Sequence, residues 1–210
     1  ISEKMRNQIR GINQAVKNSE DGVSLIQTAE GNMNEIHSIL QRMGELSTKA
    51  ANDVNAAEDR TAIQDEITQL SSEIDSIASK AEFNGTKLLD GNFTDKKLQT
   101  GAKSGEVMTI KISGMSSANL KVNNLSMASH TSASSAMSAV TAAIKQVSAA
   151  RSLLGAKQNR LEYTINNLEN YSENLTSAES QIRDTDMATE MTNYTKNNIL
   201  QQAAQSMLAQ

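Results

Sequence analysis

The most constraining feature of the sequence is an unbroken series of aliphatic residues, one every seven positions, in the carboxy-terminal third. The series comprises Val140, Val147, Leu154, Leu161, Leu168, Leu175 and Ile182. Seven residues are nearly two turns of α-helix, so these side chains lie along one side of a helix. The sequence contains no proline that would end that helix. We therefore predict one long helix from about Ser134 to Met207, whose apolar seam other helices must cover.

A second helical stripe occupies the amino-terminal quarter of the chain. Its apolar residues recur at spacings of three and four, which predicts a helix over residues 1–51. Glycine is a poor helix former, and each glycine here costs about 1 kcal/mol relative to alanine. We interpret these glycines as points where the backbones of neighbouring helices come close, and Gly44 alternatively as an opening for a partner. The four are Gly11, Gly22, Gly31 and Gly44.

The next segment predicts a shorter helix followed by turns. Apolar residues at helical spacing between 63 and 77 indicate a second helix, capped by Asp59 and ending near Lys80. The Asn-Gly and Asp-Gly pairs in residues 84–91 are strong turn signals. Both phenylalanines of the chain, Phe83 and Phe93, flank these turns, and we expect them to pin the loop to the helices.

The pattern changes to a period of two between residues 98 and 113. Met108, Ile110 and Ile112 should point to one side, which predicts a small β-hairpin in which residues 98–100 pair with the later strand. Residues 114–135 are rich in serine, asparagine and alanine, and we expect them to form a surface excursion.

These elements predict a mainly α fold: an elongated antiparallel bundle or coiled-coil rod of three long helices with a small β-hairpin. The rod divides into an amino-terminal part, residues 1–93, a hairpin and short excursion, residues 94–133, and the carboxy-terminal helix, residues 134–210. The first and last helices should run side by side, with both termini at one end. In that pairing Ile9 lies near Met191.

Composition and motifs argue against nucleic-acid binding, a membrane span, metal binding and catalysis. The net charge is −4 without a basic stripe, which excludes nucleic acid as the expected partner, and no apolar run approaches the length of a membrane span. Cysteine is absent. The two histidines, His37 and His130, have no metal-binding spacing, and the carboxylate pairs lack surroundings that would desolvate them. We therefore expect no enzyme activity, no cofactor and no metal.

Both ends of the sequence begin or stop within a helical pattern. The chain opens on Ile1 already in register with the first stripe, and it stops at Gln210 without a cap or stop signal. We expect it to be a fragment of a longer protein.

Six segments in order resemble bacterial flagellin. They are residues 21–31 (DGVSLIQTAEG), 40–46 (LQRMGEL), 82–91 (EFNGTKLLDG), 154–161 (LGAKQNRL), 178–188 (AESQIRDTDMA) and 199–203 (ILQQA). The resemblance covers nearly the whole chain except residues 94–135. It implies a structural subunit of the extracellular flagellar filament, which serves motility and is exported unfolded, assembles at the distal tip and packs lengthwise against other flagellin subunits.

The resemblance also implies what the chain lacks. Flagellins have conserved terminal segments that coil only on assembly, and these would precede Ile1 and follow Gln210. Their loss would leave a monomeric fragment that does not polymerise. Variable outer domains of the family are inserted where residues 114–135 lie, and this chain has almost nothing there.

Two partners follow from the family. Toll-like receptor 5, an innate immune receptor, recognises many flagellins through residues that match Gln41, Arg42, Glu45, Leu46 and Glu66. Gly44 replaces a second arginine of that motif, and Ser47-Thr48 replaces a small apolar pair. Alternatively, the charged residues form an ordinary solvated face that makes contacts along the filament.

The second partner is the flagellar secretion chaperone, which engages the carboxy-terminal region of flagellins. The matching residues here are Asn197, Ile199, Leu200, Ala203 and Met207. Two other readings of the whole chain are a hook–filament junction protein, which is a flagellin relative, and a signalling coiled coil such as a chemoreceptor stalk.

Overall fold

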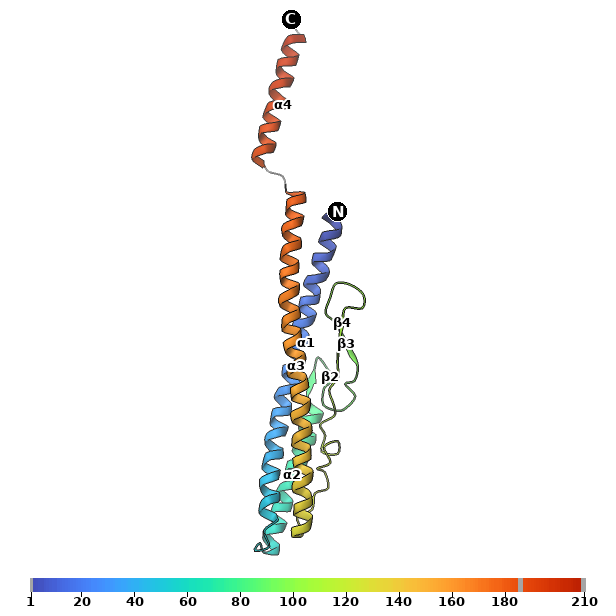
Figure 1. The fold of residues 1–210 in the computed structure, drawn as a ribbon, viewed down its shortest axis with the longest axis vertical. Helices are drawn as coiled ribbons and strands as arrows, with labels where there is room; N and C mark the ends of the chain where they lie inside the picture. The colour runs from blue at the N-terminus through green and yellow to red at the C-terminus, as the bar shows by residue number, and fades with distance from the viewer. Residues whose placement is uncertain (1, 185–186, 209–210) are drawn as a thin grey trace.

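The structure, a computed structural model, describes residues 2–184 and 187–208. Figure 1 shows a slender rod in which long helices run antiparallel beside two small hairpins. The elements are α1 (Ser2–Ala50), α2 (Ala57–Lys80), β1 (Glu82–Phe83), β2 (Thr86–Lys87), β3 (Lys96–Gln99), β4 (Val107–Ile110), α3 (His130–Arg183) and α4 (Met187–Leu208). The predicted fold class is confirmed.

The heptad series forms the seam between α1 and α3, the two helices in most extensive contact. Its first four members, Val140 to Leu161, are buried. They pack in one core with α1 residues such as Met33, Ile36 and Leu40. Further along α3 the cover thins, so that Leu168 and Leu175 are half-buried and Ile182 is 55% exposed. The seam is therefore shielded from water only where other elements pack over it.

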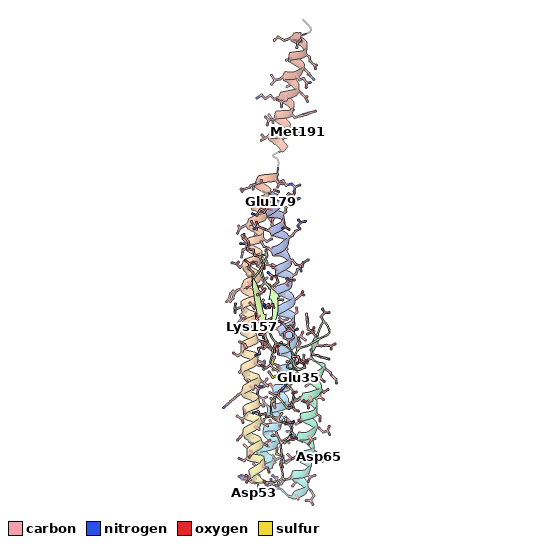
Figure 2. All side chains as sticks on the ribbon, turned by 90° about the vertical axis from the view of Figure 1, so that its right-hand side faces the viewer. Glu35, Asp53, Asp65, Lys157, Glu179 and Met191 are labelled. Atoms are coloured by element: carbon pink, nitrogen blue, oxygen red, sulfur yellow. The ribbon has the colours of Figure 1, made fainter. Side chains whose placement is uncertain are left out.

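The register between the paired helices differs from the predicted one. Ser2 donates to a carboxylate oxygen of Glu179 at 2.7 Å, and Ser172 donates to the side-chain oxygen of Asn13 at 2.8 Å. α1 therefore begins at the level of Glu179, and Met191 lies beyond that start (Figure 2). The predicted neighbourhood of Ile9 and Met191 is wrong, and α4 projects past the amino-terminal end of the rod (Figure 1).

The single carboxy-terminal helix predicted from 134 to 207 is also wrong. α3 begins four residues earlier, at His130, and ends at Arg183, because Asp184 has an extended backbone with φ −75° and ψ 124°. Ser180 and Asp184 bond through their side chains at this end. Aspartate and serine favour helix ends because their side chains compete for local hydrogen bonds. Residues 185 and 186 lie outside the described part of the chain, and α4 resumes at Met187.

The hairpin of β3 and β4 follows the predicted alternation, although its first strand is Lys96–Gln99 rather than residues 98–100. β3 pairs antiparallel with β4, with Leu98 opposite Met108, and Met108, Ile110 and Ile112 are buried as expected. Lys157 on α3 donates to the Thr109 carbonyl and so holds the hairpin to the rod.

The predicted turn also forms. It joins β1 to β2, and both flanking phenylalanines pack into the core, Phe93 fully and Phe83 in part. At the start of α2, however, the cap position belongs to Ala56. Asp59 lies three residues inside the helix, where its carboxylate accepts the Ala56 N–H at 3.3 Å.

The segment predicted as a surface excursion is built into the core instead. Its apolar side chains Met115, Leu120, Val122 and Met127 are buried although residues 111–129 contain no helix or strand. Two side chains of α2 hold its backbone. Asp75 accepts the N–H and the hydroxyl of Ser117 at 2.8 and 2.7 Å, and Gln64 donates to the Leu125 carbonyl and accepts the Met127 N–H.

The glycines of α1 divide into two kinds. An added Cβ at Gly22 would lie 2.4 Å from the Leu98 side chain, and one at Gly11 would lie 3.2 Å from Ala102, so these two glycines admit the β3–β4 hairpin. Gly31 has open space, and a Cβ at Gly44 would meet only Val140, at 3.7 Å. Close contact therefore occurs at Gly11 and Gly22, but with the hairpin, and the predicted close approach of neighbouring helix backbones is wrong for all four glycines.

Candidate functional site: an arginine shared by two helices

Arg42 is the centre of an exposed charged cluster that joins α1 to α2. Its Nη2 lies 2.8 Å from Oε1 of Glu66 on α2, and its Nε donates to the same oxygen at 2.9 Å. Its Nη1 donates to Glu45, three residues along α1, at 3.2 Å. All three side chains remain accessible to solvent. We call Arg42, Glu45 and Glu66 the charged cluster.

Hydrogen bonds from Arg42 to Glu66, and next to Glu45, raise the pKa of Arg42 above its ordinary value. The guanidinium is exposed to solvent, so this shift says little about folding stability. Its significance is geometric, because one cation holds two carboxylates from different helices at a fixed spacing. A planar guanidinium with several N–H donors is suited to this kind of shared contact.

The helices place this cluster by burying the opposite face of α1. The core-facing residues of this segment are Met43, Leu46, Ser47 and Ala50. Positions 41, 42 and 45 lie on the other side of the helix and face solvent. On α2, Ile63 and Ile67 are buried, so Glu66 points outward beside α1. The cluster thus follows from the helical period of both segments.

The structure brings together four of the five residues predicted for receptor contact on one surface. Gln41 is exposed on α1 next to the charged cluster. Leu46, the fifth, is only 4% exposed and belongs to the core. The expectation that Leu46 offers a surface contact does not fit this burial. Leu46 instead supports the helix from beneath Arg42 and Glu45.

The structure shows where the residues that differ from the family motif lie. Gly44 lies beside the cluster, where a side chain would find ordinary space. Ser47 is buried, and its hydroxyl donates to the Met43 carbonyl at 2.7 Å. Thr48 is exposed and donates to the Gly44 carbonyl at 2.9 Å. Both hydroxyls are satisfied within α1.

α4 forms a second candidate surface. The residues predicted for the chaperone all lie on it and are all exposed: Asn197, Ile199, Leu200, Ala203 and Met207. Met191, Ile199 and Leu200 lie on one open, shallow side of this helix. Large apolar side chains that face solvent are the mark of a helix that binds a partner.

Among residues 2–184 and 187–208, no group of three or more His, Asp or Glu side chains could hold a metal ion. His130 contacts the Ala51 carbonyl at 2.6 Å, near the end of α1. None of the described helices is both long and apolar enough to cross a membrane.

The sequence matches two regions defined in one protein family. Residues 1–94 match the bacterial flagellin N-terminal helical region, and residues 137–210 match the bacterial flagellin C-terminal helical region. The chain belongs to the bacterial flagellin family. It is therefore a structural subunit of the extracellular flagellar filament, acts in motility and is not an enzyme. Flagellin subunits polymerise with one another.

Individual relatives agree with this assignment. A flagellin of Halalkalibacterium halodurans is 51% identical over the whole chain, which covers 78% of that relative. The crystal structure of Bacillus cereus flagellin superposes with a TM-score of 0.65 at 30% identity, over 85% of this chain and 94% of that one. The predicted loss of terminal segments gains no support from these matches and stays a prediction.

A flagellar hook-associated protein from Vibrio parahaemolyticus shares the architecture with a TM-score of 0.72, over 86% of this chain and 95% of that one. Its identity is 13%, which shows the fold alone. The alternative of a hook–filament junction protein is therefore not favoured over flagellin.

Proposed function

We propose that this flagellin, besides forming filaments, is recognised by Toll-like receptor 5 through the charged cluster and Gln41. The observation that supports this most directly is the contact of Arg42 with Glu66, which unites residues from two helices in one exposed surface. Residues 42 and 66 are 24 positions apart, and only the folded rod presents them together. Exposed charged groups in a binding interface determine the choice and orientation of the partner more than they determine affinity.

In the proposed complex Arg42 is the main contact. Arginine is enriched among residues that dominate binding energy, and its truncation often costs more than 1 kcal/mol. Glu45 and Glu66 hold the guanidinium in place before the receptor arrives. Leu46 takes part only by keeping α1 in position.

Arg42→Ala is expected to weaken receptor binding about tenfold, a loss of roughly 1.4 kcal/mol. The measurement is a titration of purified receptor ectodomain by surface plasmon resonance. Lys49→Ala is the matched control, because Lys49 is an exposed cation on the same helix outside the charged cluster. Equal affinity of the Arg42→Ala protein and the parent, with helicity unchanged, would remove Arg42 from the site. Gly44→Arg adds a cation beside the cluster and is expected to strengthen binding.

We also propose that α4 binds the flagellar secretion chaperone. The exposure of Ile199, Leu200 and Met207 on one helix supports this, because an apolar helix surface can lie in the groove of a partner.

For the chaperone, Ile199→Glu is expected to lower affinity about tenfold or more, since it places a charge in the apolar contact. Isothermal titration with the chaperone of the producing bacterium measures this. Gln202→Glu introduces the same charge at another exposed position of α4 and serves as the control. The assignment of Ile199 would be abandoned if both variants bound as the parent does.

A further inference from the structure

We propose that Asn84 is a site of spontaneous chemical modification, at which the side-chain amide is converted to aspartate and isoaspartate. Asn84 is the only asparagine of the sequence that is followed directly by glycine. It occupies the tip of the turn between β1 and β2 together with Gly85. The inference is independent of the receptor and chaperone proposals.

The reaction needs only the protein and water. The backbone nitrogen of Gly85, after giving its proton to hydroxide, attacks Cγ of Asn84. A new C–N bond closes a five-membered imide, the bond from Cγ to Nδ2 breaks, and ammonia leaves. Water then adds to one carbonyl of the imide. Opening at the side-chain carbonyl gives aspartate, and opening at the main-chain carbonyl gives isoaspartate, which has one more backbone methylene.

The surroundings of Asn84 leave this attack unhindered. Both Asn84 and Gly85 are exposed, and a Cβ built at Gly85 would have no neighbouring atom within 4 Å. Asn92 is a useful contrast within the described chain. Its amide donates to the Asp90 carboxylate at 2.9 Å, and the bulky Phe93 follows it. A neighbouring side chain restricts access of the backbone nitrogen, whereas glycine does not.

The turn geometry determines what each product does. Asn84 and Gly85 have φ values of 47° and 74°, as in the tight two-residue turns that connect antiparallel strands. Aspartate tolerates a left-handed conformation, so the aspartate product fits the turn. Isoaspartate lengthens the turn by one carbon atom. The hairpin has only two paired positions, Glu82 with Lys87 and Phe83 with Thr86, and has little to resist that change.

The consequence reaches the core through Phe83. This side chain is partly buried and packs against the core just before Leu88 and Leu89, which are fully buried. Isoaspartate at position 84 would therefore release the hairpin and loosen Phe83. Because the filament lies outside the cell, the modified fraction should rise with the time that a subunit has spent there.

The experiment incubates the folded chain in neutral and in alkaline buffer and maps its peptides by mass spectrometry. Exchange of an amide NH2 for a hydroxyl gives a defined mass gain, and electron-transfer fragmentation distinguishes isoaspartate from aspartate. We expect the gain at Asn84 before any other asparagine, with a higher rate in alkaline buffer and with isoaspartate present. Asn84→Gln, whose longer side chain closes the ring poorly, is expected to abolish the gain at this position.

A synthetic peptide of residues 82–87 measures the rate without the fold. If the folded chain keeps the Asn84 amide intact for several half-lives of this peptide, the turn protects the residue and the proposal is wrong. It is also wrong if another asparagine reacts first. Asn84→Asp tests the two products separately, since hydrogen exchange of the hairpin should be unchanged in that variant and faster only where isoaspartate has formed.

Discussion

Val147→Asp is expected to unfold the rod, whereas Ile182→Asp is expected to leave its stability within about 0.5 kcal/mol of the parent. The two residues belong to the same heptad series, yet Val147 is 0% exposed and Ile182 is 55% exposed. A carboxylate at position 147 would be buried without a partner or would have to be protonated at a cost. We expect a loss of at least about 4 kcal/mol, which is exceptional for one substitution.

Urea unfolding followed by circular dichroism measures both variants. Val147→Ala separates the charge from the cavity, because it removes apolar contact without introducing a polar group, and its loss should be the smaller one. If the Val147→Asp protein unfolds at the urea concentration of the parent, the seam between α1 and α3 does not hold the rod together as the burial of Val147 indicates.

The contrast between these two residues shows where the sequence is informative. The seven-residue period predicts a helix and the side that must be covered, and it predicts these from neighbours in the chain. It contains nothing about how far the covering helix extends. That limit depends on where α1 begins, beside Glu179, which is a contact between residues 177 positions apart.

The sequence contains a signal for the end of α3. Asp184, Thr185 and Asp186 precede Met187, and residues of this kind favour helix ends over helix interiors. The uninterrupted heptad series outweighed them in the prediction. The series continues to Ile182 in sequence, but the last member has lost its cover and gives the helix little reason to continue.

The charged cluster was predictable only in part. Helical spacing places Arg42 and Glu45 on the solvent side of α1, whereas Glu66 was assigned to the same surface through the family resemblance, and its contact with Arg42 was not predicted. The burial of Leu46 could have been predicted from spacing alone. This residue lies three residues after Met43 and four before Ala50, both of which are buried, and so falls on the same face.

The buried segment after β4 was the least predictable part of the fold. Its buried residues Met115, Leu120, Val122 and Met127 recur at no fixed period, so they indicate neither a helix nor a strand. Its backbone is held by side chains of α2, Gln64 and Asp75, rather than by a regular ladder. Such contacts join distant residues one at a time and leave no local pattern.

Asp75→Ala is expected to destabilise the rod by about 1.5 kcal/mol. Hydrogen bonds to a charged group contribute roughly 1.5–3 kcal/mol each, but the two here share one carboxylate, and Asp75 is exposed, so water weakens them. Asp75 accepts both the backbone N–H and the hydroxyl of Ser117. Ser117 is buried, so without Asp75 its donors would lose their partner away from water. The measurement is urea unfolding together with hydrogen exchange of the Ser117 amide.

Asp65→Ala provides the matched control, because Asp65 is an exposed carboxylate on the same helix (Figure 2). Ser117→Ala removes the hydroxyl but keeps the backbone donor, and it is expected to cost less than Asp75→Ala. Loss of the hydrogen bonds between Asp75 and Ser117 should speed hydrogen exchange of the Ser117 amide and of the neighbouring buried Leu120, while the amides of α1 and α3 remain protected. If exchange instead rises equally in all helices, Asp75 stabilises the rod as a whole, and the segment after β4 does not depend on this carboxylate for its place in the core.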